Sequence, residues 1–191
     1  MIVVNLNIRG MGGGCIKSRY VNNIIAYEGE EFVCLQETKL KVLTEAKCFS
    51  VWGNNRVGWL HNEGVNGCGS LLSMWNLDSF SYASHVMGKG FIAVFRDHLK
   101  SNLRCVVVNV YAACNMNDKR LLWGELSNVK VASQDHVWCF CGDFNVVRRR
   151  SERKGIRVGD EHASEIVGFN SFIDANLLVE LPIVGKRYTW F

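Results

Sequence analysis

Five polar side chains stand at the ends of apolar segments, where side chains can do chemistry rather than pack. They are Asn7, Glu37, Tyr111, Asp143 and Asn145. Carboxylates can bind a hard cation and accept a proton, whereas amides and a phenol can donate hydrogen bonds to an anionic oxygen. The carboxylate and amide oxygens suit Mg²⁺, which proteins commonly hold with one or two carboxylates plus phosphate oxygens of a substrate. Each short motif taken alone is also compatible with a turn or a helix cap.

Strand-like segments must position these side chains. Apolar, β-branched runs predict strands that end next to the five polar residues, and further runs predict strands between them. The predicted strands are 2–8, 31–35, 70–75, 91–95, 103–111 and 136–141. Helical spacing of apolar residues predicts three helices, around 20–27, 121–129 and 166–173, with Asp160 as a cap for the third. Strands outnumber helices, which favours mixed sheets with helices packed outside them.

One segment carries most of the positive charge. The net charge is +4, and residues 148–157 contain six basic side chains and one acid. A local basic segment favours a phosphate-rich partner, although a solvated surface loop has the same composition. The candidates for contacts with a nucleic acid in this segment are Arg148, Arg149, Arg150, Arg153 and Lys154.

Length and composition limit the class of protein. The 191 residues are enough for one domain, which we expect to span 1–191, and the 48% hydrophobic content is that of a globular protein. No apolar run is long enough to predict a membrane span, and the first residues do not resemble a secretory signal. The eight cysteines form no C-x-x-C pair, which favours reduced thiols in an intracellular protein over a zinc site or disulfides.

The polar motifs in their order resemble those of the endonuclease/exonuclease/phosphatase superfamily. The similarity lies in Leu6-Asn7-Ile8-Arg9-Gly10, Leu35-Gln36-Glu37-Thr38-Lys39, Asn109-Val110-Tyr111-Ala112 and Gly142-Asp143-Phe144-Asn145. Within that superfamily the chain is most similar to the endonuclease domain of non-LTR (LINE-type) retrotransposons. The Asn-Ile-Arg-Gly start and the final Tyr188-Thr189-Trp190 carry this closer similarity.

The resemblance implies a four-layer α/β sandwich, in which two packed mixed sheets lie between helices. It implies hydrolysis of phosphodiester bonds with Mg²⁺, or Mn²⁺ as a substitute, and no organic cofactor. Glu37 would bind the metal, Asp143 would orient or deprotonate the attacking water, and Tyr111 would donate a hydrogen bond to the phosphate. Asn7 would be a second metal-binding residue beside Glu37, and Asn7 and Asn145 would position the phosphate and the ligands around the metal.

The resemblance also implies a partner and a cellular setting. DNA is the expected partner, with Arg9 and Trp190 as further contact residues beside the basic segment. A retrotransposon origin implies a longer polyprotein with a reverse transcriptase and access to the nucleus.

Two later family motifs, a Ser-x-x-Asp block and a Ser-Asp-His block, would come after Phe191. The chain is therefore expected to be a C-terminally truncated domain, which keeps two further hypotheses open. The first is a catalytically impaired remnant that at most binds metal or nucleic acid, and the second is a phosphatase-type member of the superfamily.

Overall fold

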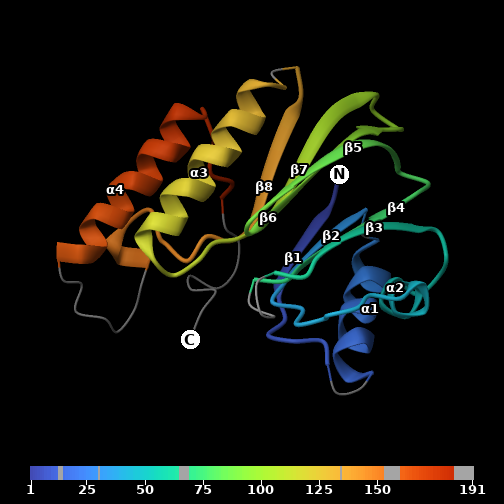
Figure 1. Cartoon of the computed structure of the whole chain (residues 1–191). Coiled ribbons are helices and arrows are strands. Elements are labelled where there is room, and N and C mark those ends of the chain that lie inside the picture. Colours follow the sequence, from blue (N-terminus) through green and yellow to red (C-terminus); the bar gives the residue numbers. More distant parts are fainter. Residues whose placement is uncertain (13–14, 30, 65–68, 134, 153–159, 183–191) are drawn as a thin grey trace.

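Two four-stranded sheets pack face to face, and helices cover the outer face of each (Figure 1). A computed structural model describes residues 1–12, 15–29, 31–64, 69–133, 135–152 and 160–182. The first sheet has the strand order β1 (Val3–Asn7), β2 (Phe32–Gln36), β4 (Leu71–Asn76) and β3 (Val57–Asn62). The second has the order β5 (Phe80–Gly88), β6 (Phe91–His98), β7 (Leu103–Tyr111) and β8 (Val137–Asp143). The predicted α/β sandwich with mixed sheets is confirmed.

Both sheets are mixed in the same way. β1 pairs with β2 in parallel, and β7 pairs with β8 in parallel, whereas the other neighbours are antiparallel. Parallel neighbours need a crossover connection, and here helices supply it. α1 (Ile16–Glu28) joins β1 to β2, and α3 (Met116–Val131) joins β7 to β8.

Three apolar cores separate the four layers. One lies between the first sheet and the helices α1 and α2 (Glu45–Trp52), and includes Val21, Leu35 and Val51. The middle core lies between the sheets and includes Phe32 and Val107. The third packs α3 and α4 (Asp160–Ala175) on the second sheet, as Figure 1 shows on the opposite side of the molecule. Because β2 faces apolar layers on both sides, all five of its residues are buried.

The sequence pattern misses three elements that have weak local signals. β5 is an edge strand, and after the buried Phe80 its residues from Ser81 to Met87 are exposed, so it lacks an alternating apolar pattern. β3 is the edge strand of the other sheet. The short α2 begins at a Thr44 cap, whose side chain accepts a hydrogen bond from the Lys47 amide at 3.3 Å. Within the described residues, none of the helices combines the length and apolarity needed to cross a bilayer.

Candidate active site

The carboxyl ends of four strands meet at one end of the two packed sheets. In the register of the parallel pairs, Asn7 lies opposite Gln36 and Tyr111 lies opposite Asp143. Glu37 follows directly after β2. Parallel strands deliver their carboxyl ends to the same edge of a sheet, where ligands commonly bind. Two such pairs, one in each sheet, therefore bring these polar side chains together across the middle core.

Asn7 links the two carboxylates of this cluster. Its Nδ2 donates to Glu37 Oε1 at 2.8 Å and to Asp143 Oδ2 at 3.3 Å. Its Oδ1 accepts a hydrogen bond from the Arg9 backbone N–H at 3.2 Å. One amide thus stabilises two carboxylates that come from different sheets and would otherwise repel each other. In this orientation Asn7 positions the carboxylates, and cation binding through its oxygen stays a prediction.

Tyr111 completes the cluster from β7. Its hydroxyl donates a hydrogen bond to Glu37 Oε1 at 3.0 Å. Burial, together with the neighbouring Glu37 and Asp143 carboxylates, raises the pKa of Tyr111 to about 12. The phenol therefore stays protonated at neutral pH and remains a hydrogen-bond donor.

Two hydrogen bonds donated by Asn145 stabilise the turn that follows Asp143. The Asn145 backbone N–H donates to Asp143 Oδ1 at 2.9 Å, and Asn145 Nδ2 donates to the Ala112 carbonyl at 2.6 Å. Just before this turn, Gly142 adopts a φ of +131°, and a Cβ atom there would lie 1.9 Å from the Val110 carbonyl oxygen. Only glycine fits at position 142, where β8 approaches β7 this closely. The position of Asp143, the next residue, therefore depends on Gly142.

Left-handed backbone conformations mark three of the four motifs. Arg9, Glu37, Lys39 and Asn145 have φ values between 46° and 54°. Such conformations are costly for residues other than glycine and persist where the surrounding structure enforces them. Around Glu37 the enforcing contacts are backbone hydrogen bonds, from Gly10 N to the Glu37 carbonyl at 2.6 Å and from Met11 N to the Thr38 carbonyl at 2.7 Å.

A buried amide network lies directly beneath the cluster. Gln36 Nε2 donates to Asn109 Oδ1 and to Asn5 Oδ1, both at 2.7 Å. Asn109 Nδ2 in turn donates to the Leu72 carbonyl at 3.1 Å. Gln36 and Asn109 belong to different sheets and are fully buried, so this network fixes the spacing of the sheets next to Glu37. Both residues belong to the sequence motifs, but no role was predicted for either.

The donor chemistry fits a hard divalent cation. Glu37 and Asp143 supply carboxylate oxygens around the single amide of Asn7. Within the described ranges, His, Cys, Asp and Glu side chains form no group of three that could bind a metal ion. Two carboxylates are enough for Mg²⁺, because this ion keeps several waters and shares its ligands with substrate phosphates.

The predicted basic residues have different structural roles. The Arg148 guanidinium donates to Asn170 Oδ1 at 2.9 Å, and its NH1 lies 3.4 Å from a Glu180 oxygen. Arg148 therefore ties the segment to α4 and is not a free phosphate-binding cation. Arg149 and Arg150 are exposed, as is Arg9, and the Arg149 guanidinium lies 3.6 Å from a Glu152 carboxylate oxygen. Three predicted contact residues lie outside the described residues: Arg153, Lys154 and Trp190.

Other basic residues near the cluster were not singled out from the sequence. Lys17 Nζ donates to the carbonyls of Ile8 at 2.7 Å and Arg9 at 3.1 Å, which places a cation beside the end of β1. The Lys39 backbone N–H donates to Ser70 Oγ at 2.7 Å. Lys39 belongs to the Gln-Glu-Thr-Lys motif, so the sequence could have indicated it. Only the tertiary structure places Lys17 beside the end of β1.

Comparisons with known proteins identify the fold. No family model and no curated protein matches the chain. Among solved structures, the AP endonuclease LMAP from Leishmania major matches with a TM-score of 0.67 and 17% identity, over 91% of this chain and 66% of that chain. An endonuclease/exonuclease/phosphatase family protein from Bacteroides thetaiotaomicron matches with a TM-score of 0.62 and 11% identity, over 85% and 68%.

A third solved structure contains DNA. TDP2 from D. rerio, complexed with a single-strand DNA product, matches with a TM-score of 0.56 and 14% identity, over 87% of this chain and 64% of that chain. The chain thus spans about two thirds of the length of the solved chains that it matches. These similarities establish that the chain has the endonuclease/exonuclease/phosphatase fold.

Proposed function

We propose that this protein is a Mg²⁺-dependent phosphodiesterase that nicks DNA, of the kind found in non-LTR retrotransposons. The observation that carries the proposal is the hydrogen-bonded cluster of Asn7, Glu37, Tyr111 and Asp143. It combines two carboxylates with two neutral donors at the carboxyl ends of four strands. Hydrolysis of a phosphodiester requires the same combination of groups: ligands for a cation, a proton acceptor for the attacking water, and hydrogen-bond donors to the phosphate oxygens.

The chemistry divides among these side chains. Asp143 orients the attacking water and accepts its proton. Tyr111 donates to a phosphate oxygen when it releases Glu37, and Asn145 donates through its second N–H, while Asn7 holds the two carboxylates in place. Glu37 would hold the metal, Mg²⁺ or Mn²⁺, which supplies Lewis-acid stabilisation of the developing negative charge when it is bound.

Nucleic acid is the favoured substrate class. Arg149 and Arg150 are exposed and begin six residues after Asp143, and Lys17 lies beside the end of β1. Cations in these places would contact backbone phosphates on either side of the cluster. The match to a DNA-bound TDP2 structure supports the same class. We also propose that the protein is intracellular, has access to nuclear DNA, and is joined to a reverse transcriptase in a longer polyprotein.

Nicking of supercoiled plasmid by the purified protein tests the proposal. We expect open-circular product with Mg²⁺ or Mn²⁺ and none with EDTA. Glu37→Gln and Asp143→Asn should each lower the nicking rate by about 10²–10⁴-fold, which is typical for the loss of one acid–base or charge-stabilising group.

A matched control separates the site from a general loss of acidic charge. Asp97 is exposed on β6 and lies in register with Arg104, far from Tyr111 at the other end of β7, so Asp97→Asn should nick like the wild type. A folded wild-type protein without Mg²⁺-dependent nicking contradicts the proposal and favours the remnant that only binds. Hydrolysis of small phosphoesters without DNA nicking favours the phosphatase-type alternative.

A further inference from the structure

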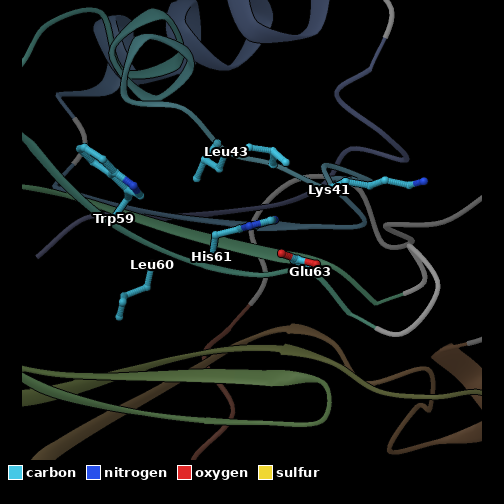
Figure 2. A pocket seen from close by; sticks show the side chains of 7 residues that line it. Lys41, Leu43, Trp59, Leu60, His61 and Glu63 are labelled. Atoms are coloured by element: carbon cyan, nitrogen blue, oxygen red, sulfur yellow. The ribbon is translucent and has the colours of Figure 1, made fainter.

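A pocket of about 370 Å³ lies beside β3, outside the carboxylate cluster (Figure 2). The β2–α2 loop forms one side, and residues at the end of β3 form the other. Its walls combine an indole, an imidazole, both signs of charge and aliphatic groups. The lining residues are Lys41, Val42, Leu43, Trp59, Leu60, His61 and Glu63.

The pocket and Glu37 lie at the same end of the strands of the first sheet. Asn62, at the end of β3, is in register with Leu71 of β4, which is in register with Gln36 of β2. Lys41 follows Glu37 by only four residues, so an extended chain places it within about 14 Å of Glu37. Nucleotides along one strand of a duplex are about 3.4 Å apart, so this distance corresponds to about four nucleotides at most.

The aromatic wall of the pocket, Trp59, packs against a second ring. Trp59 packs edge to face against Phe49 of α2, with ring centroids 5.9 Å apart and an interplanar angle of 86°. Bases of single strands commonly stack on aromatic side chains held in this way, because every base has a π face. Figure 2 shows the indole at one end of the pocket and Lys41 at the other.

The polar wall offers hydrogen-bond acceptors. The His61 ring interacts with the Leu40 backbone, and burial lowers its pKa, which favours the neutral ring. Its Nε2 is fully buried and has no hydrogen-bond partner within the described part of the chain, so the Glu63 carboxylate is the acceptor that a ligand can reach. Glu63 is exposed and adds carboxylate acceptors, and the exposed Lys41 adds a cation for a backbone phosphate. A ligand that fits must therefore present N–H donors on a flat ring beside a phosphate.

We propose that this pocket binds one unpaired nucleobase of the DNA strand, within about four nucleotides of the scissile phosphate. Guanine fits best, because its N1–H and its amino group are adjacent donors that can face a carboxylate, whereas thymine offers a single N–H. Lys41 contacts the phosphate of the same nucleotide. This inference rests on the proposed function, because it requires a DNA strand at the Glu37–Asp143 cluster.

Equilibrium binding in EDTA tests the pocket without cleavage. Fluorescent single strands of eight thymidines are compared with strands in which one dG replaces each thymidine in turn. We expect dG at one or two positions to tighten binding about tenfold over the all-thymidine strand. Glu63→Gln should reduce the ratio of the dG-strand affinity to the all-thymidine affinity to about one, whereas Lys41→Ala should weaken binding of every strand.

Glu63 and Lys41 are exposed, so neither variant should impair folding. Glu125→Gln, an exposed carboxylate on α3 over the other sheet, is the matched control and should keep the gain. Equal affinity for all strands, or a gain that survives Glu63→Gln, overturns the pocket assignment even where plasmid nicking holds. A Glu63-dependent gain without plasmid nicking supports the pocket and refutes only the nicking activity.

Discussion

At the scale of single residues, the candidate site depends on neutral donors that hold two carboxylates together. Asn7 donates to both Glu37 and Asp143, and Tyr111 adds a second hydrogen bond to Glu37. These contacts do not neutralise the carboxylates, so the cluster keeps the negative charge that a divalent cation requires. Tyr111 has a single O–H, so it must turn away from Glu37 before it can donate to a phosphate oxygen.

Tyr111 should ionise at a higher pH than a tyrosine of ordinary pKa. Its pKa is raised from about 10 to about 12. Because the folded-state pKa lies above the unfolded value, its contribution to stability is complete below pH 10 and is lost as the pH rises towards 12. A spectrophotometric titration at alkaline pH should show one late phenolate in the wild type that is absent from Tyr111→Phe. A Tyr111→Phe curve that still contains this late phenolate contradicts the assignment.

Arg96 is an unusual residue of the middle core. Its side chain is 1% exposed and lies between the rings of Phe32 and Phe80, with its guanidinium carbon 3.8 and 3.7 Å from the two ring centroids. Its guanidinium nitrogens have no oxygen or nitrogen partner within the described residues, and the Cys105 thiol is the side chain that interacts with them. Burial lowers the pKa of Arg96 to about 10, so the group is still charged at neutral pH and its desolvation is offset mainly by the two rings.

Replacing Arg96 with methionine should therefore stabilise the protein. Apolar side chains of similar volume often stabilise by about 1–4 kcal/mol when they replace buried ionic groups. Urea unfolding at neutral pH would show a higher midpoint for Arg96→Met. Arg56→Met is the control, because Arg56 pairs with Asp78 on the surface and should change the free energy of unfolding by less than about 1 kcal/mol. A lower midpoint for Arg96→Met would show that the aromatic contacts outweigh the desolvation cost.

At the scale of elements, α4 is held against the rest of the molecule by polar contacts as well as by aromatic packing. Phe169 and Phe172 pack against Trp123 of α3. Lys119 of α3 is 1% exposed, and its ammonium lies 2.9 Å from a Glu165 carboxylate oxygen of α4. The position of α4 also constrains the segment after Asp143 through the hydrogen bond of Arg148 to Asn170.

The two partners of this ion pair should differ in their effect on stability. Glu165→Ala leaves a buried ammonium without this carboxylate, and breaking a buried pair in this way costs about 3–5 kcal/mol. Lys119→Met removes the buried charge itself and should cost less. Thermal unfolding of both variants at the same pH checks the order, and a Lys119→Met protein less stable than Glu165→Ala would contradict it.

At the scale of the whole molecule, the distribution of charge matters more than the total of +4. Arg149 and Arg150 are exposed beyond the end of β8, whereas the exposed Lys100 and Arg104 lie at the opposite end of the β6–β7 pair from Tyr111. The first pair follows the end of β8 that carries Asp143, whereas the second pair is at the other end of the strands. A DNA strand at that end should therefore contact Arg149 and Arg150 and not the distant pair.

The salt dependence of DNA binding measures these contacts. Arg149→Ala/Arg150→Ala should weaken binding for all sequences and reduce the slope of log affinity against log salt concentration by about 2, since each lost phosphate contact contributes about 1. Lys100→Ala/Arg104→Ala removes the same charge from the opposite end and should leave the slope unchanged. Equal effects of the two double variants would indicate a general electrostatic attraction instead of a defined binding edge.

Local patterns were sufficient for most elements and for the identity of the candidate residues. β1, β2, β4, β6, β7, β8 and three helices arise from runs whose periodicity is visible in the chain. Asn7, Glu37, Tyr111 and Asp143 follow apolar runs at strand ends, and a strand places its last residue at the edge of a sheet whatever its neighbours are. The exposed edge strand β5 and the buried Arg96 break these patterns, because their environment comes from other segments.

The sequence by itself determined which side chains stand at the strand ends and in which order. The tertiary structure alone decided that Asn7 meets Asp143 across 136 positions of the chain, that Arg148 turns towards α4, and that Lys41 and Glu63 share a pocket. The physical reason is that periodicity records only whether a residue faces an apolar layer. Which residues meet depends on how the sheets and helices pack, and that packing is set by contacts between segments far apart in the chain.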